Sequence, residues 1–222
     1  MKKNKPIITG QLKKWKGGFG KVYTERNAIS VSGMDRMYKG RYGATRSGLN
    51  KIFLDKIDRS ARILEVGSNV GNQLLCLQKM GFKRLYGIEP QDYAVELSKK
   101  RTKGISIIRG NIFDIPFKDD YFDIIFTSGV LIHINPKDIN RAIKEIHRCS
   151  RVYIWGFEYY SKRYEEVLYR GHKDLLWKAN FSGIYKEIFP GLKVVKISFL
   201  EHLDNSGNTD AMFLLKKRIR KK

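Results

Sequence analysis

The chain has 222 residues, 42% of them hydrophobic and 12% aromatic, which is enough for one globular domain with its own core. No apolar run approaches the roughly 18 residues that cross a bilayer, and the basic start lacks the apolar segment of a secretory signal, so we expect a cytoplasmic protein. Its 44 basic and 22 acidic residues give a net charge of +22, which favours an anionic partner such as nucleic acid, although solvated lysines account for it equally well.

The first 44 residues predict a basic N-terminal arm. They are rich in glycine, lysine and aromatic residues and have little clear period, so we expect at most one short helix there. Positive charge gathers at both ends of the chain: residues 1–60 hold 15 basic and 4 acidic residues, and residues 216–222 read KKRIRKK. We expect the remaining residues, 45–222, to form a single domain.

From residue 45 onward, helical and extended patterns alternate. A helix over residues 45–57 precedes predicted strands at 62–66, 84–88, 105–109, 122–127 and 152–157, with helices between them at 70–80, 92–103 and 136–147. This alternation predicts an α/β fold with a doubly wound, mostly parallel sheet. Two further runs, 193–200 and 211–217, are separated only by turn residues and predict a C-terminal antiparallel hairpin, which completes a seven-stranded Rossmann-like sheet.

No structural metal is expected. Cys76 and Cys149 lie in apolar-periodic segments and lack the spacing of metal ligands, so we interpret both as buried free thiols. The four histidines are scattered along the chain and do not pair at the spacing of a metal site.

The first predicted strand runs directly into a glycine-rich loop in the stretch ILEVGSNVG, residues 63–71. Such a loop brings backbone N–H groups close to a ligand at the carboxyl ends of the strands. The dinucleotide fingerprint requires a glycine where Asn69 stands, and its third glycine would follow one place after Gly71. The loop therefore favours a nucleotide other than NAD.

Three polar side chains at successive strand ends define that ligand more closely. Glu65 precedes the glycines, where an acid suits a cationic amino group, and Glu89 ends the second strand, where it can accept hydrogen bonds from ribose hydroxyls. Asn111 follows the third strand and can contact an adenine edge, although it could instead cap the turn. A nucleoside with a cationic amino-acid tail fits all three positions, so the predicted cofactor is S-adenosylmethionine, with S-adenosylhomocysteine as product.

These motifs resemble those of class I S-adenosylmethionine-dependent methyltransferases: E-x-G-x-x-x-G, then GNIFDIPF, then FDIIFTSGVLIHI. Further blocks, YTERN, GVLIHINP, RCSRVYI, EYY and YRGH, resemble the methylases associated with pseudaminic acid biosynthesis. The resemblance implies that the arm covers the cofactor site and that the cofactor contacts include Tyr23, Arg26, Gly67, Ser68, Gly71, Ile112 and Ser128. A purely structural role for the glycine loop and an ordinary surface role for Glu89 are the alternatives.

Candidate acceptor residues follow the fourth and fifth strands. His133 is the first candidate for the general base, and a histidine that only packs over the cofactor is an equal alternative. Glu158, with Tyr159 and Tyr160, could orient a polyhydroxylated acceptor, or could belong to a loop of half-buried aromatics. An insertion near residues 158–180 carries three more candidates: Tyr169, Arg170 as a carboxylate or phosphate ligand or a mere ion pair, and His172 as a second base.

The sequence thus predicts methyl transfer to a hydroxyl or amine of a small, sugar-like acceptor, which is carboxylated or nucleotide-linked. A nucleic-acid methyltransferase is the alternative that the charge of +22 favours, although no N-P-P-Y or D-P-P-Y tetrapeptide follows the fourth strand. A methyltransferase-like module that binds nucleotide without turnover is the third hypothesis.

Overall fold

A seven-stranded, mostly parallel sheet organises the computed structural model, which describes residues 8–204 and 206–218. In spatial order its strands are β3 (Ser106–Arg109), β2 (Arg84–Glu89), β1 (Arg62–Val66), β4 (Phe122–Ser128), β5 (Ser150–Tyr159), β9 (Thr209–Lys216) and β8 (Lys193–Glu201). The first five run parallel, and β9 pairs antiparallel with both β5 and β8. The predicted fold class is therefore confirmed.

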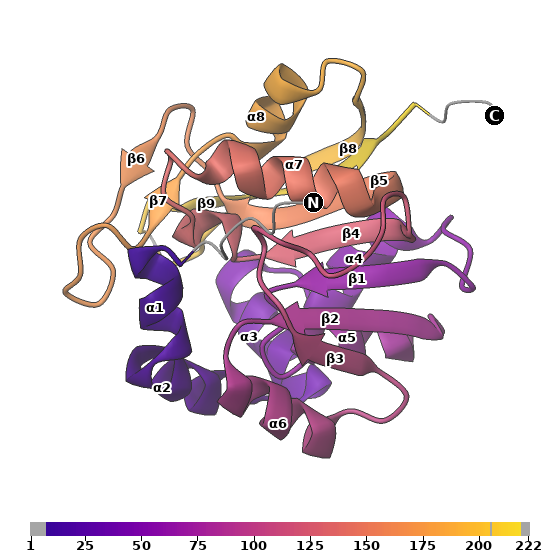
Figure 1. Ribbon diagram of the computed structural model, residues 1–222, viewed down its shortest axis with the longest axis horizontal. Helices are drawn as coiled ribbons and strands as arrows, with labels where there is room; N and C mark the ends of the chain where they lie inside the picture. The colour runs from indigo at the N-terminus through magenta and orange to yellow at the C-terminus, as the bar shows by residue number, and fades with distance from the viewer. Residues whose placement is uncertain (1–7, 205, 219–222) are drawn as a thin grey trace, which may run out of the picture.

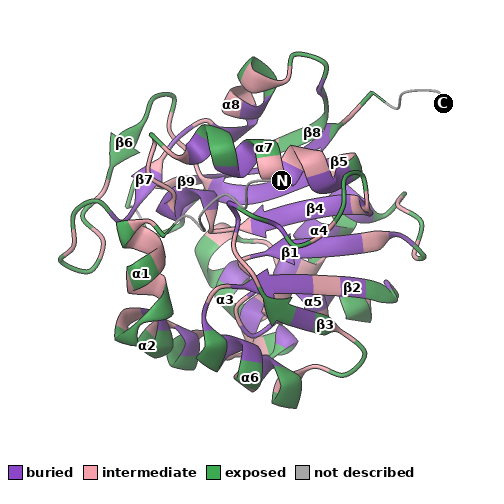
Figure 2. Ribbon diagram, in the orientation of Figure 1, coloured by how far each residue is buried: buried purple, intermediate pink, exposed green. Residues whose placement is uncertain are grey.

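Helices cover both faces of this sheet (Figure 1). Helix α7 (Ile139–Cys149) and helix α8 (Phe181–Ile188) lie on one face, and their apolar residues pack on those of β1, β4 and β5. The opposite face is covered by α3 (Val31–Tyr42), α4 (Arg46–Leu54), α5 (Asn72–Lys79) and α6 (Asp92–Arg101). The central strands are buried on both sides, whereas the helices expose their outer faces (Figure 2), as doubly wound sheets require.

The carboxyl ends of the parallel strands all lie at one edge of the sheet, which we call the carboxyl edge. In Figure 1 the arrowheads of β1, β2 and β4 point toward α1 (Gly10–Lys16) and α2 (Gly18–Asn27). A small two-stranded ribbon, β6 (Glu165–Glu166) with β7 (Trp177–Lys178), lies near the same edge within the predicted insertion. This edge is where ligands bind in open α/β sheets.

The N-terminal segment is the main departure from prediction. Instead of an arm with one short helix, residues 10–42 form three helices. Side-chain caps begin two of them: Thr9 accepts a hydrogen bond from the Leu12 N–H, and Ser30 accepts one from the Gly33 N–H. Helix α7 also differs in its start, because it begins at Ile139 and Pro136 lies in the turn before it.

No helix within residues 8–204 and 206–218 is both long and apolar enough to cross a membrane. The same residues contain no group of three or more histidine, cysteine, aspartate or glutamate side chains that could hold a metal ion. Within them Cys76 and Cys149 are buried free thiols. The end of the basic tail, residues 219–222, lies outside the described residues.

Candidate functional site

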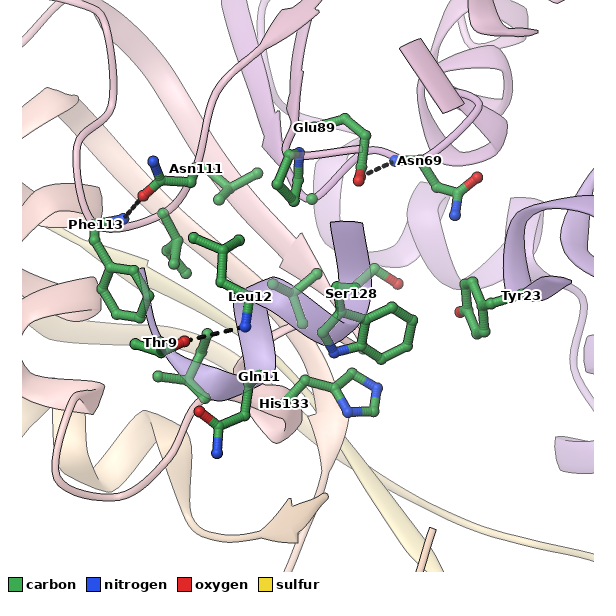
Figure 3. A pocket seen from close by; sticks show the side chains of 18 residues that line it. Thr9, Gln11, Leu12, Tyr23, Asn69, Glu89, Asn111, Phe113, Ser128 and His133 are labelled. Atoms are coloured by element: carbon green, nitrogen blue, oxygen red, sulfur yellow. Dashed lines mark hydrogen bonds between the residues drawn. The ribbon is translucent and has the colours of Figure 1, made fainter. Parts of the chain in front are cut away.

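Two adjoining cavities lie at the carboxyl edge of the sheet. The first has a volume of about 120 Å³, and Figure 3 shows that side chains from α1 and from the ends of the strands line it. The second, of about 500 Å³, extends toward α3, β5 and β9. Four residues line both cavities, and together they form a shared wall: Tyr23, Ser128, Gly129 and His133.

The glycine-rich loop follows β1 and turns sharply before α5. Gly67 and Gly71 have φ values of 73° and 81°, and Asn69 takes the left-handed conformation at 47°. A Cβ atom on Gly67 would lie 2.7 Å from Val130, so the close approach of the two loops requires glycine at that position. Asparagine tolerates positive φ better than most residues, which explains how the turn forms without the second glycine of a dinucleotide site.

Glu89 lies at the end of β2 and holds the glycine-rich loop in place. Its carboxylate accepts a hydrogen bond from the backbone N–H group of Asn69 at 2.9 Å (Figure 3). It accepts another from the backbone N–H group of Gln91 at 3.0 Å. Burial raises the pKa of Glu89 to about 7, although these two hydrogen bonds oppose the shift. Each carboxylate oxygen accepts one of these bonds and has capacity for another, and Glu89 lines the first cavity.

Glu65, at the end of β1, faces the second cavity with an unsatisfied oxygen. Within the described residues, Glu65 Oε2 and the nearby Ser68 Oγ are buried without a hydrogen-bond partner. Burial raises the pKa of Glu65 well above its ordinary value, and the Arg46 guanidinium partly opposes this. A buried carboxylate without its full set of partners is costly for a protein, so the arrangement suits a ligand that brings a positive charge.

The far end of the first cavity is lined by Asn111, Ile112 and Phe113 from the loop after β3. Asn111 Oδ1 accepts a hydrogen bond from the Phe113 N–H at 2.9 Å, so this residue does cap the turn (Figure 3). Its side-chain NH₂ group can still donate to a ligand, and Ile112 and Phe113 supply apolar walls on which a flat ring can pack.

His133 lies in a short 3-10 turn after β4, in the shared wall. Its Nδ1 atom donates to the Leu175 carbonyl at 2.7 Å, so Nε2 carries the lone pair of the neutral ring. Burial lowers the pKa of His133 to about 4, and its ring contacts those of Trp15 and Tyr169, with centroids 4.6 and 5.3 Å away. His133 is therefore neutral at physiological pH and can accept a hydrogen bond through Nε2.

Glu158, predicted as a catalytic carboxylate, has a different role in the structure. Its side chain is 1% exposed and accepts hydrogen bonds from the backbone N–H groups of Val130, at 3.0 Å, and Ile132, at 3.4 Å. Burial raises its pKa to about 7. The carboxylate thus supports the loop that carries His133, and within the described residues it lies outside the lining of both cavities.

The other acceptor candidates divide into two groups. Tyr159, Tyr169 and Arg170 line the second cavity, as the sequence suggested. Tyr160 instead packs on Phe199, with ring centroids 4.6 Å apart, and His172 packs edge-on against Phe19 at 5.6 Å. Neither Tyr160 nor His172 is among the described residues that line the two cavities. Each side chain packs against an aromatic neighbour instead.

The two N-terminal helices close over the carboxyl edge. Thr9, Gln11, Leu12 and Trp15 from this segment line the first cavity, Tyr23 lies in the shared wall, and Arg26 lines the second cavity. Gln91 fastens these helices: its NH₂ group donates to the backbone carbonyls of Trp15, at 3.1 Å, and Gly17, at 3.2 Å. Its side-chain oxygen accepts from Thr24 at 3.0 Å, and the Thr24 hydroxyl in turn accepts from the Asn69 NH₂ group at 3.1 Å.

Sequence reasoning missed two buried side chains that shape the site, Gln91 and Arg46. Arg46 is 0% exposed, donates to the Tyr38 hydroxyl at 3.1 Å and to Ser128 Oγ at 3.4 Å, and lies over the Phe157 ring at 4.8 Å. A signal for it existed, because Arg46 shares the apolar helical face of Leu49 and Phe53, where a charged residue is rarely placed without a partner. Gln91 carries no comparable signal.

Comparison with known protein families matches residues 64–152 to the family described as a methyltransferase domain. Residues of this chain are 37% identical to an uncharacterised methyltransferase of Staphylococcus carnosus over 83 residues, which are 37% of this chain and 39% of that protein. An uncharacterised methyltransferase of Oceanobacillus iheyensis is 26% identical over 180 residues, 77% of this chain and 80% of its own length. The match to the staphylococcal relative therefore covers less than half of that protein.

Among solved structures, the 1,6-didemethyltoxoflavin-N1-methyltransferase of Burkholderia thailandensis, determined with bound S-adenosylhomocysteine, superposes with a TM-score of 0.63. The superposition covers 96% of this chain and 92% of that one at 13% sequence identity, so it compares folds only.

Proposed function

We propose that this chain, whose residues 64–152 match the methyltransferase domain family, is a class I S-adenosylmethionine-dependent methyltransferase that transfers a methyl group from that cofactor to a hydroxyl or amine of a small acceptor. The observation that carries the proposal is the pair of cavities with a shared wall, because methyl transfer is a displacement in line between two ligands. The first cavity suits the nucleoside of the cofactor, and the second suits the cofactor's amino-acid end together with the acceptor.

The residues present fit the cofactor. The unsatisfied Glu65 carboxylate and Ser68 hydroxyl would hold the amino-acid end, and Gly67 and Gly71 give that end room to approach the backbone. Glu89 would accept hydrogen bonds from the ribose hydroxyls, and Asn111 with Ile112 would contact the adenine. When bound, S-adenosylmethionine supplies an electrophilic methyl group on a positively charged sulfur.

The residues of this chain would align the acceptor with the methyl group and accept the proton that the acceptor releases. His133 is neutral and turns Nε2 away from its Leu175 partner, so it can accept the proton of an acceptor hydroxyl. Tyr159, Tyr169 and Arg170 would orient the acceptor in the second cavity. The N-terminal helices, including Tyr23 and Arg26, would exclude water from the reacting atoms, and no metal ion is needed for these steps.

The acceptor that we propose is a sugar or nucleotide sugar handled in the cytoplasm during surface glycan biosynthesis. Support comes from the phenol-rich second cavity, which can hydrogen-bond to several hydroxyl groups, and from the motifs shared with the methylases associated with pseudaminic acid biosynthesis. The net charge of +22 favours RNA as the rival acceptor, so both classes belong in the test.

The first experiment is calorimetric titration of the purified protein with S-adenosylmethionine, S-adenosylhomocysteine and NAD. We expect micromolar binding of the two sulfur nucleosides and none of NAD. A screen for release of S-adenosylhomocysteine with nucleotide sugars, and separately with RNA, then identifies the acceptor class. Binding of NAD alone would refute the proposal, and cofactor binding without turnover on any acceptor would favour a non-catalytic module.

A further inference from the structure

We infer that the acceptor carries at least two negative charges, as a pyrophosphate or a phosphorylated sugar does, and that Arg26, Arg41 and Arg170 bind them. This inference rests on the proposed function and specifies the substrate class of the same site. The three arginines come from α2, α3 and the insertion before β7, segments far apart in the sequence, yet all three line the second cavity.

None of these three guanidinium groups forms an ion pair with a carboxylate in the described part of the chain. By contrast, Arg109, Arg148 and Arg151 pair with acids elsewhere on the molecule. Keeping three guanidinium groups around one cavity, none of them in direct contact with a carboxylate, costs free energy through their mutual repulsion. Such an arrangement is expected where a ligand supplies the missing negative charge.

Two acids line the second cavity and offset part of its positive charge, and Asp210 is near enough to Arg41 for their charges to attract. Glu65 is buried near Arg46 and lies where the cofactor's amino group would bind. Asp210 Oδ2 accepts hydrogen bonds from the Tyr42 hydroxyl, at 2.8 Å, and from His202 Nε2, at 2.6 Å. The loaded cofactor adds a positive sulfonium, so the cavity stays positive in the state that receives the acceptor.

The phenols in the cavity wall add hydrogen-bond donors. Burial raises the pKa of Tyr23, Tyr42 and Tyr159, so these groups remain protonated at physiological pH. Tyr42 is committed to Asp210, which leaves the hydroxyl groups of Tyr23 and Tyr159 for a ligand. Guanidinium and phenol donors together suit a ligand with many acceptor oxygens.

The backbone at Arg170 is consistent with a positioned side chain. Tyr169 and His172 exchange two backbone hydrogen bonds of 2.9 Å, and the two residues between them have φ values of 52° and 77°. This is a two-residue turn that prefers asparagine, aspartate or glycine at its first central position. Arginine is disfavoured in this left-handed conformation, and residues held in this way concentrate at binding sites.

The test uses protein saturated with S-adenosylhomocysteine and inorganic pyrophosphate as the probe, titrated by calorimetry at low salt. We expect saturable binding at one site, weakened about tenfold or more by Arg41→Gln and by Arg170→Gln, because each removes charge-assisted hydrogen bonds. Arg26→Gln should act in the same direction. The matched control is Arg109→Gln, an exposed arginine on β3 that pairs with Asp92, and it should leave pyrophosphate binding unchanged.

The outcomes separate the inference from the proposed function. If the wild-type protein fails to bind S-adenosylhomocysteine, the proposed function is wrong, and this inference falls with it. If the nucleoside binds but pyrophosphate does not, or if Arg109→Gln weakens binding as much as Arg41→Gln, only the inference is overturned. Arginine-dependent binding of a short RNA without pyrophosphate binding would also overturn it, in favour of a macromolecular acceptor.

Discussion

At the scale of single residues, three buried glutamates near the carboxyl edge differ in what surrounds them. Glu65 keeps an oxygen without a hydrogen-bond partner among the described residues, Glu89 shares its oxygens between the backbone and the first cavity, and Glu158 is satisfied by backbone N–H groups. Burial raises the pKa of all three. Residue type and strand position alone therefore could not distinguish the two acids that line a cavity from the one that does not.

Because we propose Glu89 as the ribose ligand, we expect cofactor binding to depend on pH. Its pKa of about 7 means that it becomes protonated as the pH falls below 7, and the protonated form is a poorer acceptor for ribose hydroxyls. We expect the affinity for S-adenosylhomocysteine to fall on the order of tenfold between pH 7.5 and pH 5.5. Calorimetry across this range measures the effect, and Glu89→Gln should bind more weakly at pH 7.5 and show a shallower pH dependence.

Glu96→Gln is the matched control for this prediction, because Glu96 is an exposed acid on α6 whose partner is Lys99. It should reproduce the pH dependence of the wild-type protein. Equal affinity of wild type and Glu89→Gln at every pH would mean that the ribose lies elsewhere.

Glu158→Gln should lower stability. The carboxamide turns one acceptor oxygen into a donor that faces the N–H groups of Val130 and Ile132, so buried donors lose their partner. We expect the free energy of unfolding to fall by about 1–3 kcal/mol, measured by urea titration at pH 8. Glu201→Gln, at the exposed end of β8, should have little effect. Unchanged stability with lost turnover would instead restore the catalytic role that the sequence predicted.

At the scale of elements, a chain of hydrogen bonds connects Glu89 to the N-terminal helices. Glu89 holds the backbone of Asn69, the Asn69 side chain donates to Thr24, and Thr24 donates to Gln91, which fastens the end of α1. The position of α1 and α2 is thus tied to the same groups that we propose as cofactor contacts. Order in these helices should therefore depend on cofactor binding.

Gly20→Ala tests this connection. A Cβ atom at Gly20 would lie 1.8 Å from the Trp15 carbonyl oxygen and 2.6 Å from Gln91 Nε2, so α1 cannot keep its place against α2. We expect faster hydrogen exchange over residues 10–27 and weaker binding of S-adenosylhomocysteine, with exchange of the central strands unchanged.

Gly18→Ala is the control for Gly20→Ala. A Cβ atom there meets nothing within 4 Å among the described residues, and alanine has the higher helix propensity. It should leave both the exchange pattern and the affinity as in the wild-type protein. Similar protection in both variants would show that the helices do not depend on this close packing.

The elements that sequence analysis predicted well are those with an apolar pattern. The run FDIIFT and the spaced apolar residues of α7 both indicate surfaces that must be buried, and β4 and α7 appear where they were expected within a few residues. Helices α1 and α2 were missed because α1 buries no residue fully and α2 buries only Gly20 and Thr24. Their position depends on capping and on long-range bonds to Gln91, which leave no periodic signal.

The candidate site was predictable to a similar extent. Glu65, Glu89 and Asn111 follow strands whose ends must meet at one edge, so their grouping follows from topology. Side chains that reach the cavities from distant segments, such as Arg41 and Asp210, could not be placed before α3 and the C-terminal hairpin were known. Tyr160 and His172 are close in sequence to residues that line the second cavity. The side chain of each nevertheless packs against an aromatic ring outside the cavity lining.

At the scale of the whole molecule, the net charge of +22 is a source of self-repulsion. Nine ion pairs, including those of His202, join described residues, and most of them involve exposed side chains that contribute little. We therefore expect salt to stabilise the protein by screening repulsion: the midpoint of thermal unfolding should rise when ionic strength increases from about 20 to about 150 mM.

The control for the salt effect is a neutral osmolyte at equal osmolality, which leaves charge screening unchanged. A midpoint that falls with added sodium chloride would mean that local ion pairs outweigh the overall repulsion. Sulfate should raise the midpoint further than chloride at equal ionic strength, because a divalent anion can also occupy the positive second cavity.

The shared wall of Tyr23, Ser128, Gly129 and His133 has a kinetic consequence. A side chain that orders around one occupant also shapes the cavity of the other, so each occupant changes the affinity of the other by the same factor. We expect this change to be an increase, because the second occupant binds to a wall that the first has already ordered. The product S-adenosylhomocysteine would keep most of the contacts that S-adenosylmethionine makes. We therefore expect the enzyme with bound S-adenosylhomocysteine to bind the acceptor as well, in a ternary complex that cannot react. Turnover should then slow at high acceptor concentration unless S-adenosylhomocysteine is removed.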